Sequence, residues 1–118
     1  MSDENGIKLA VRERDPGVAI IDVEGDVTPA AETPLTETFE ELQGATSVIF
    51  NFEGLDYMNS GGIGLLVTLL VRAQRRQQQL AAYGLSDHYR QIFELTQLDD
   101  AIQVAEDEAE AIAATKEA

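Results

Sequence analysis

The sequence predicts an α/β fold: a mixed, largely parallel sheet of about five strands with about four helices, in the order β-β-α-β-α-β-α-β-α. Three observations support this prediction. The first two strand-like stretches are joined by Asp15, Pro16 and Gly17, which suits the turn of an antiparallel hairpin. Each later strand-like stretch is followed by a helix-like one, which suits parallel strands with helical crossovers. A length of 118 residues suits a single domain, residues 1–118, of which we expect residues 1–6 to be flexible.

The expected strands are short runs that are rich in β-branched and aromatic residues or that alternate apolar and polar residues. The third, Ser-Val-Ile-Phe-Asn-Phe at residues 47–52, has the composition of a strand buried in the middle of a sheet. The fourth contains two alanines, which favour a strand less strongly. The strands are expected at residues 7–14, 18–27, 47–52, 80–85 and 102–105.

The expected helices begin at capping residues and carry apolar residues at helical spacing. Thr28 followed by Pro29 is a strong helix start, because a hydroxyl can cap the helix and proline suits its first position. The second helix is apolar nearly all round in its first half, which indicates burial against the sheet. It ends with Arg72, Arg75 and Arg76, which would balance its dipole in solvent. The helices are expected at about residues 28–44, 63–78, 86–97 and 107–116.

Residues 55–66 follow the third strand and run into the second helix, and they have the composition of a tight loop followed by a helix N-terminus. Either Asn59 or Ser60 can cap that helix, and Gly61 and Gly62 suit a turn. The first N–H groups of a helix have no intrahelical partner, and the helix dipole attracts negative charge there. A phosphate on Ser60 would therefore be stabilised, although capping alone also explains these residues.

The run Tyr-Met-Asn-Ser-Gly-Gly-Ile-Gly at residues 57–64 resembles the signature of STAS domains of the anti-sigma factor antagonist family. On that pattern, Ser60 matches the serine that a partner kinase phosphorylates, Gly62 and Gly64 match two family glycines, and Ile63 matches a leucine. Asn59 departs from the pattern, because the family usually has Asp there, and this removes a charge beside Ser60.

The resemblance extends from about Lys8 to Ala111. It includes Gly-Asp-Val at residues 25–27, Asn-Phe-Glu-Gly-Leu at 51–55 and the region 93–98. Two further positions depart from it. Gly61 stands where the family has a second Ser or Thr, which leaves Ser60 as the one hydroxyl on this loop. Thr28 stands where many members have Asp.

The formal net charge is −14, which argues against nucleic acid or an anionic membrane as a direct partner. The charge is uneven, because residues 16–71 hold nine acidic residues and no Lys or Arg. Such a region would steer the protein toward a basic protein surface, or it serves solubility alone. The chain has no cysteine, no apolar run long enough to span a membrane and no signal-peptide pattern, so we expect a cytoplasmic protein.

Few residues favour catalysis, so we expect no catalytic site, no metal and no cofactor. His88 is the one histidine, and with no cysteine in the chain a zinc site would need carboxylates alone around it. We expect His88 on a helix surface. A triad of Ser60, His88 and Asp56 or Asp87 lacks the Gly-x-Ser-x-Gly turn around its serine. The glycines after Ser60 are not followed by Lys-Ser or Lys-Thr and do not form a nucleotide phosphate loop.

The resemblance implies a regulatory binding protein, an anti-sigma factor antagonist acting as a monomer or weak dimer. Its unphosphorylated form would bind an anti-sigma factor of the ATP-binding serine-kinase type and free the sigma factor. Phosphorylation of Ser60 would end the binding, and a phosphatase would restore it. The expected partner-binding residues are Asp26, Thr28, Asp56, Tyr57, Met58, Asn59, Ser60, Gly61, Gly62 and Ile63.

Three alternatives remain open. The chain could be a constitutive STAS scaffold in a signalling assembly, which the missing Asp before Ser60 would suit. It could sense a small ligand at the loop, although no aromatic or basic pocket residues suggest one, and an enzyme is the remaining alternative. Bulky substitutions at Gly61 or Gly62 are expected to block the partner sterically.

Overall fold

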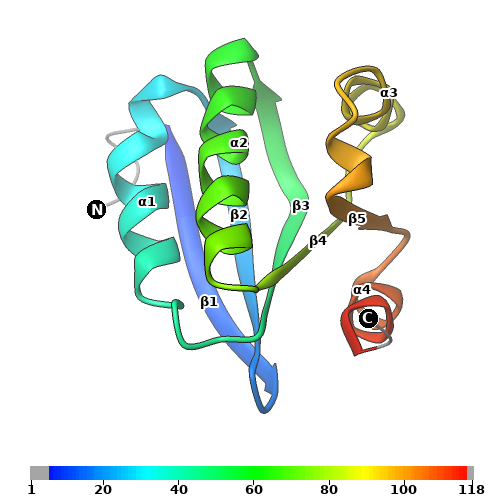
Figure 1. The fold of residues 1–118 in the computed structure, drawn as a ribbon. Coiled ribbons are helices and arrows are strands. Elements are labelled where there is room, and N and C mark those ends of the chain that lie inside the picture. The colour runs from blue at the N-terminus through cyan, green and yellow to red at the C-terminus, as the bar shows by residue number, and fades with distance from the viewer. Residues whose placement is uncertain (1–5, 117–118) are drawn as a thin grey trace.

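The computed structural model describes residues 6–116, and Figure 1 shows their arrangement. The elements are β1 (Ile7–Asp15), β2 (Val18–Val27), α1 (Glu32–Glu40), β3 (Ser47–Met58), α2 (Ser60–Arg75), β4 (Gln79–Tyr83), α3 (Asp87–Leu95), β5 (Ile102–Ala105) and α4 (Glu108–Lys116), with short 3₁₀ turns η2 (Pro29–Ala31) and η3 (Leu98–Asp100). The expected flexibility of residues 1–5 lies outside the described residues. Gly6 is described, and its carbonyl accepts a hydrogen bond from the Asp26 amide at 2.7 Å.

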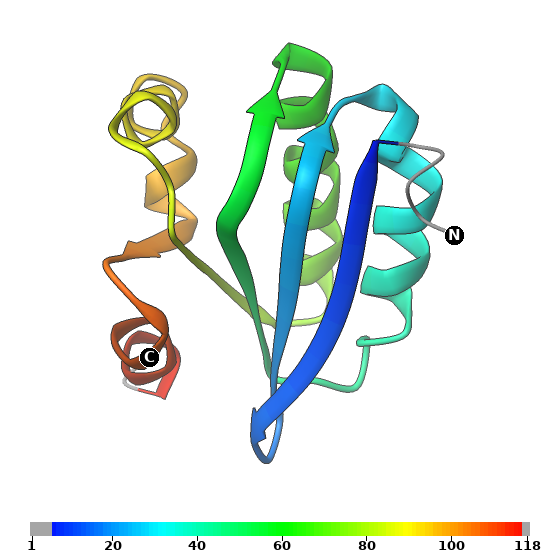
Figure 2. The ribbon, with the colours of Figure 1, turned by 180° about the vertical axis from the view of Figure 1, so that it is seen from behind.

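The five strands form one sheet in the order β1-β2-β3-β4-β5. β1 pairs with β2 antiparallel, and the three other pairs are parallel. The predicted mixed, largely parallel sheet and its element order are therefore confirmed. Figure 2 shows β1, β2 and β3 from the side opposite α1 and α2.

The two faces of the sheet carry separate apolar clusters, because successive residues of a strand point to opposite faces. Ile21 of β2 belongs to the larger cluster, which α1, α2 and α3 cover with residues such as Phe39, Leu66 and Phe93. Ile20 belongs to the smaller cluster, which α4 covers with Ala111. The helices thus lie on both faces, and both clusters contain fully buried side chains.

A polar network ties α4 to β1 across the sheet. Glu108 accepts hydrogen bonds from Arg12 at 3.0 Å, from Arg14 at 2.6 Å and from the Tyr83 hydroxyl at 2.9 Å. Arg12 also binds Asp22 through two hydrogen bonds of 2.7 and 2.8 Å. The arginines lower the pKa of Glu108 to about 2, while burial and the neighbouring carboxylate raise the pKa of Tyr83 to about 12.

Several element boundaries differ from those predicted, most of all around the central stretch. β3 continues to Met58 instead of ending at residue 52, because β2 continues beside it and pairs with Gly54, Leu55, Tyr57 and Met58, with two register shifts along the way. α2 begins at Ser60 instead of residue 63 and ends at Arg75. The first helix ends at Glu40 and is preceded by η2, which Thr28 caps as predicted. Most of the supposed loop is therefore strand.

Candidate functional site

Ser60 lies where β3 passes directly into α2, with Asn59 between them. Asn59 is the N-cap of α2, because its side-chain Oδ1 accepts a hydrogen bond from the Gly62 amide at 2.9 Å. Its carbonyl accepts one from the Ile63 amide at 3.0 Å, the first backbone hydrogen bond of the helix. Of the two candidate caps, Asn59 therefore has this role, and Ser60 is the first helical residue with its side chain exposed.

The turn is held from two sides by consecutive amides. The Asn59 N–H donates to the Val27 carbonyl at the end of β2, at 3.3 Å. The Met58 N–H donates to the Tyr89 hydroxyl of α3, at 2.9 Å. Ser60 is thus displayed to solvent on a backbone that two neighbouring elements fix.

The glycines after Ser60 pack against β2 and the turn that follows it. A Cβ atom on Gly62 would lie 1.9 Å from the Val27 carbonyl oxygen, and one on Gly61 would lie 2.5 Å from Cγ of Pro29. Gly62 is buried, so a bulky residue there would displace α2 before it met any partner. The steric test that the sequence suggested for Gly62 is therefore wrong in its reasoning, because the clash is internal.

The expected partner-binding residues divide into exposed, half-buried and buried ones. Met58 is 4% exposed and its side chain belongs to the core, whereas Tyr57 is 50% exposed. The exposed members are Asp56, Tyr57 and Ser60; the half-buried ones are Asp26, Thr28, Asn59, Gly61 and Ile63; the buried ones are Met58 and Gly62. The register pairs Asp26 with Tyr57, which places the end of β2 beside the end of β3.

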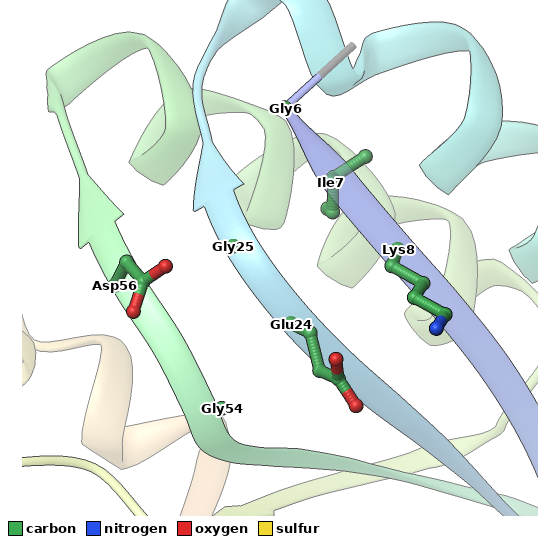
Figure 3. Close-up of a pocket in the computed structure, with 7 residues that line it drawn as sticks. All are labelled: Gly6, Ile7, Lys8, Glu24, Gly25, Gly54 and Asp56. Carbon is green, nitrogen blue, oxygen red and sulfur yellow. The ribbon is translucent and has the colours of Figure 1, made fainter. Parts of the chain in front are cut away.

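Asp56 faces a different surface from the one that carries α1 and α2. Figure 3 shows its carboxylate above the open side of the sheet, where Glu24 and Lys8 also project. These three residues line a surface hollow of about 470 Å³, together with Gly6, Ile7, Gly25 and Gly54. The hollow is wide open to solvent. Its two carboxylates and one ammonium group give no defined pocket for the small ligand that the sequence left as an alternative.

The positive end of the α2 dipole lies at Ser60, and the arginines at the other end are bound within the molecule. Arg72 and Arg76 hold Glu40 of α1 at 2.8 and 2.6 Å. These contacts lower the pKa of Glu40. The guanidinium of Arg76 also lies over the Phe39 ring, 5.6 Å from its centre. The expectation of a purely solvated helix end is therefore wrong for Arg72 and Arg76, which join α2 to α1.

His88 lies exposed on α3, as expected, with its ring edge-on to Tyr89 at 4.9 Å between centres. Among residues 6–116, no group of three or more His, Cys, Asp or Glu side chains is arranged to hold a metal ion. No helix within these residues is both long enough and apolar enough to cross a membrane. Tyr89 is a site residue that sequence reasoning missed, because it contributed there only to the apolar side of a helix.

Comparison with known proteins agrees with this geometry. Residues 10–111 match the family model of the STAS domain. An anti-sigma-B factor antagonist of Listeria monocytogenes is 29% identical over 106 residues, which cover 88% of this chain and 93% of the relative. An anti-sigma-B factor antagonist of Staphylococcus aureus is 33% identical over 78 residues, which cover 66% of this chain and 70% of the relative.

Among solved structures, an anti-sigma factor antagonist from Mycobacterium paratuberculosis superposes with a TM-score of 0.81 at 16% identity and covers 95% of this chain and 96% of its own. At that identity the similarity shows a shared fold. The sequence matches and the fold together lead to one conclusion: the chain belongs to the STAS-domain family of anti-sigma factor antagonists.

Proposed function

We propose that this protein binds an anti-sigma factor of the ATP-binding serine-kinase type through the surface around Ser60, and that phosphorylation of Ser60 ends the binding. A phosphatase would restore the binding form. The observation that carries the proposal is the position of Ser60. Its hydroxyl is exposed on the first residue of α2, in the STAS signature, on a turn held from two sides.

The geometry supports a switch that leaves the fold intact. A phosphate on Ser60 would add about −1.5 to −2 charges next to the first turn of a helix, where the dipole and free N–H groups favour negative charge. The phosphorylated protein should therefore stay folded. Any loss of binding must then arise at the contact surface.

The energetic argument concerns desolvation. An uncharged hydroxyl between Asn59 and Gly61 can be covered by a partner at little cost. A phosphate buried there without a cationic partner would cost several kcal/mol, on the order of what removes measurable binding. Asp26 lies at the end of β2, beside the end of β3 that leads into Ser60, and its charge adds to the unfavourable potential.

The same charges indicate the chemistry of the partner surface. Residues 16–71, which contain the whole turn, have nine acidic residues and no Lys or Arg. Asp22 and Glu40 among them are paired with arginines within the molecule. The remaining carboxylates would steer a partner whose basic residues lie outside the contact with Ser60, and the association rate would fall as salt concentration rises.

The test is the binding of wild type, Ser60→Ala and Ser60→Asp to the protein that wild type captures from its host, measured by calorimetric titration after that partner is purified. Ala109→Asp is the matched control, because it adds one carboxylate to the exposed first turn of α4, on the other face of the sheet. We expect wild type, Ser60→Ala and Ala109→Asp to bind alike and Ser60→Asp to lose at least a hundredfold in affinity.

Equal affinity of all four proteins would refute the switch and leave a constitutive scaffold as the function. Capture of proteins without a kinase fold would refute the proposed partner class. Incubation of the purified pair with ATP, followed by mass spectrometry, then locates the phosphate. Modification at any residue other than Ser60 would contradict the proposal.

A further inference from the structure

We propose that Tyr89 is a positioning residue for Ser60: its hydroxyl holds the end of β3, so that α3 sets the geometry of the Ser60 turn. This inference rests on the proposed function for its role in binding. The contact that carries it is the 2.9 Å hydrogen bond from the Met58 N–H to the Tyr89 hydroxyl, between residues far apart in sequence.

The hydrogen bond substitutes for a missing strand. β4 pairs with β3 from Ser47 to Asn51, whereas β3 continues seven residues further, to Met58. On the other side, β2 accompanies β3 to its end, where Val27 pairs with Met58. At this strand end, a side chain of α3 therefore provides on the β4 side the acceptor that a strand would otherwise supply. Figure 1 shows α3 beside the upper part of β3 and above β5.

The position of this contact in the chain gives it its effect on Ser60. Met58 is two residues before Ser60, and its amide and the next one point in opposite directions, to Tyr89 and to Val27. With the Met58 and Asn59 amides both held, the Asn59 side chain is placed to accept the Gly62 N–H and so to cap α2. If the Met58 amide were released, one of the two fixed points of the turn would be lost.

The tyrosine is suited to this role. Its ring is half-buried against the larger apolar cluster, which fixes where the hydroxyl lies. Met58 is buried, so water cannot simply replace the acceptor without a rearrangement. Phenylalanine at position 89 would keep the ring packing and remove the acceptor alone.

The three tyrosines of the chain provide matched controls. Tyr57 is exposed on the same strand, one residue before Met58. Tyr83 is buried and donates its hydroxyl to Glu108 at 2.9 Å, in the network that ties α4 to β1. Each Tyr→Phe change removes one oxygen atom, so Tyr83→Phe controls for a general loss of stability and Tyr57→Phe for loss of an exposed hydroxyl.

The first experiment measures amide hydrogen exchange by NMR in wild type and the three Tyr→Phe variants. In Tyr89→Phe we expect exchange at Met58 and Asn59 to rise at least tenfold more than exchange at the core residue Ile49, as loss of one buried hydrogen bond implies. In Tyr83→Phe and Tyr57→Phe, the exchange rate of the Met58 amide should change by the same factor as that of the Ile49 amide. Uniform changes throughout Tyr89→Phe would overturn the proposal, since they indicate a merely structural role.

The second experiment measures the dissociation constant of each variant for the partner purified as above. We expect Tyr89→Phe to bind about tenfold more weakly than Tyr83→Phe at equal measured stability. Equal affinities would overturn the positioning role even if exchange at Met58 rises. Absence of any partner for wild type would refute the proposed function instead, and the exchange result would still decide whether Tyr89 holds the turn.

Discussion

Replacing Gly62 with alanine should destabilise the protein by about 2–3 kcal/mol, although alanine is normally the better residue inside a helix. Gly62 lies in the first turn of α2, where a Cβ atom would come within 1.9 Å of the Val27 carbonyl oxygen and 2.7 Å of its carbon. Both are backbone atoms, so no side-chain rotation relieves the clash. The start of α2 must move away from β2 by about 1 Å, since heavy atoms essentially never approach Cβ within 3.0 Å.

The magnitude follows from three contributions. Overpacking of a tightly packed site costs about 1–3 kcal/mol, and a rigid backbone contact belongs at the upper end. The movement would also break the Asn59 cap, which contributes about 1 kcal/mol. The better helix propensity of alanine returns up to about 1 kcal/mol.

Gly64→Ala is the control, because it makes the same change in the same helix. A Cβ atom there meets no atom within 4 Å, and the residue is exposed. This variant should be more stable than wild type by about 0.5–1 kcal/mol. Urea unfolding followed by far-ultraviolet circular dichroism measures both differences. A Gly62→Ala protein as stable as Gly64→Ala would refute the claim that close contact with β2 fixes the start of α2.

Two more predictions concern pH and the helix cap. The pKa of Glu108 is lowered to about 2 from an ordinary value of 4.5, so its ion pairs stabilise the protein above about pH 4.5 and lose this effect as pH falls toward 2. Glu108→Gln should therefore be about 1–2 kcal/mol less stable than wild type at pH 7, less than the pKa shift alone implies, because solvent partly screens the exposed ion pairs. The difference in stability, measured by urea titration, should shrink below pH 4.5. A difference that stays constant with pH would contradict this. Asn59→Ala should lower the free energy of unfolding by about 1 kcal/mol, because its helix cap is missing. Asn59→Asp should keep the stability of wild type, because an Asp cap also accepts the Gly62 N–H. Equal losses in the two variants, measured in the same titration, would count against Asn59 as the cap.

The sequence predicted the sheet and its helices because those features depend on local patterns. Thr28 and Pro29 marked the first helical segment, and the apolar run at residues 47–52 marked the central strand. These signals act within a few residues of one another. The serine that belongs to the signature was likewise identified from residues 57–64 alone.

The contacts that fix the Ser60 turn could not be predicted in this way. The hydrogen bond from Met58 to Tyr89 and the approach of Gly62 to Val27 join separate elements, so no local pattern reports them. Glu53, Gly54 and Asp56 have low strand propensity, so no local pattern extends the strand past Phe52. The pairing of Gly54, Leu55, Tyr57 and Met58 with β2 extends it. For the same reason Gly62 appeared to be a surface residue, when its small size is needed inside the molecule.

The two-sided support of the Ser60 turn has a consequence for the entropy of association. A flexible loop loses about 1–2 kcal/mol of backbone conformational freedom for each residue that a partner orders. Here Met58, Asn59 and Gly62, which flank Ser60 and Gly61, already have fixed hydrogen bonds before any encounter. If a partner binds at this turn, as proposed, little of the binding free energy would be spent on ordering it. A small contact area would then give useful affinity, and the charge of a phosphate there would be enough to cancel it.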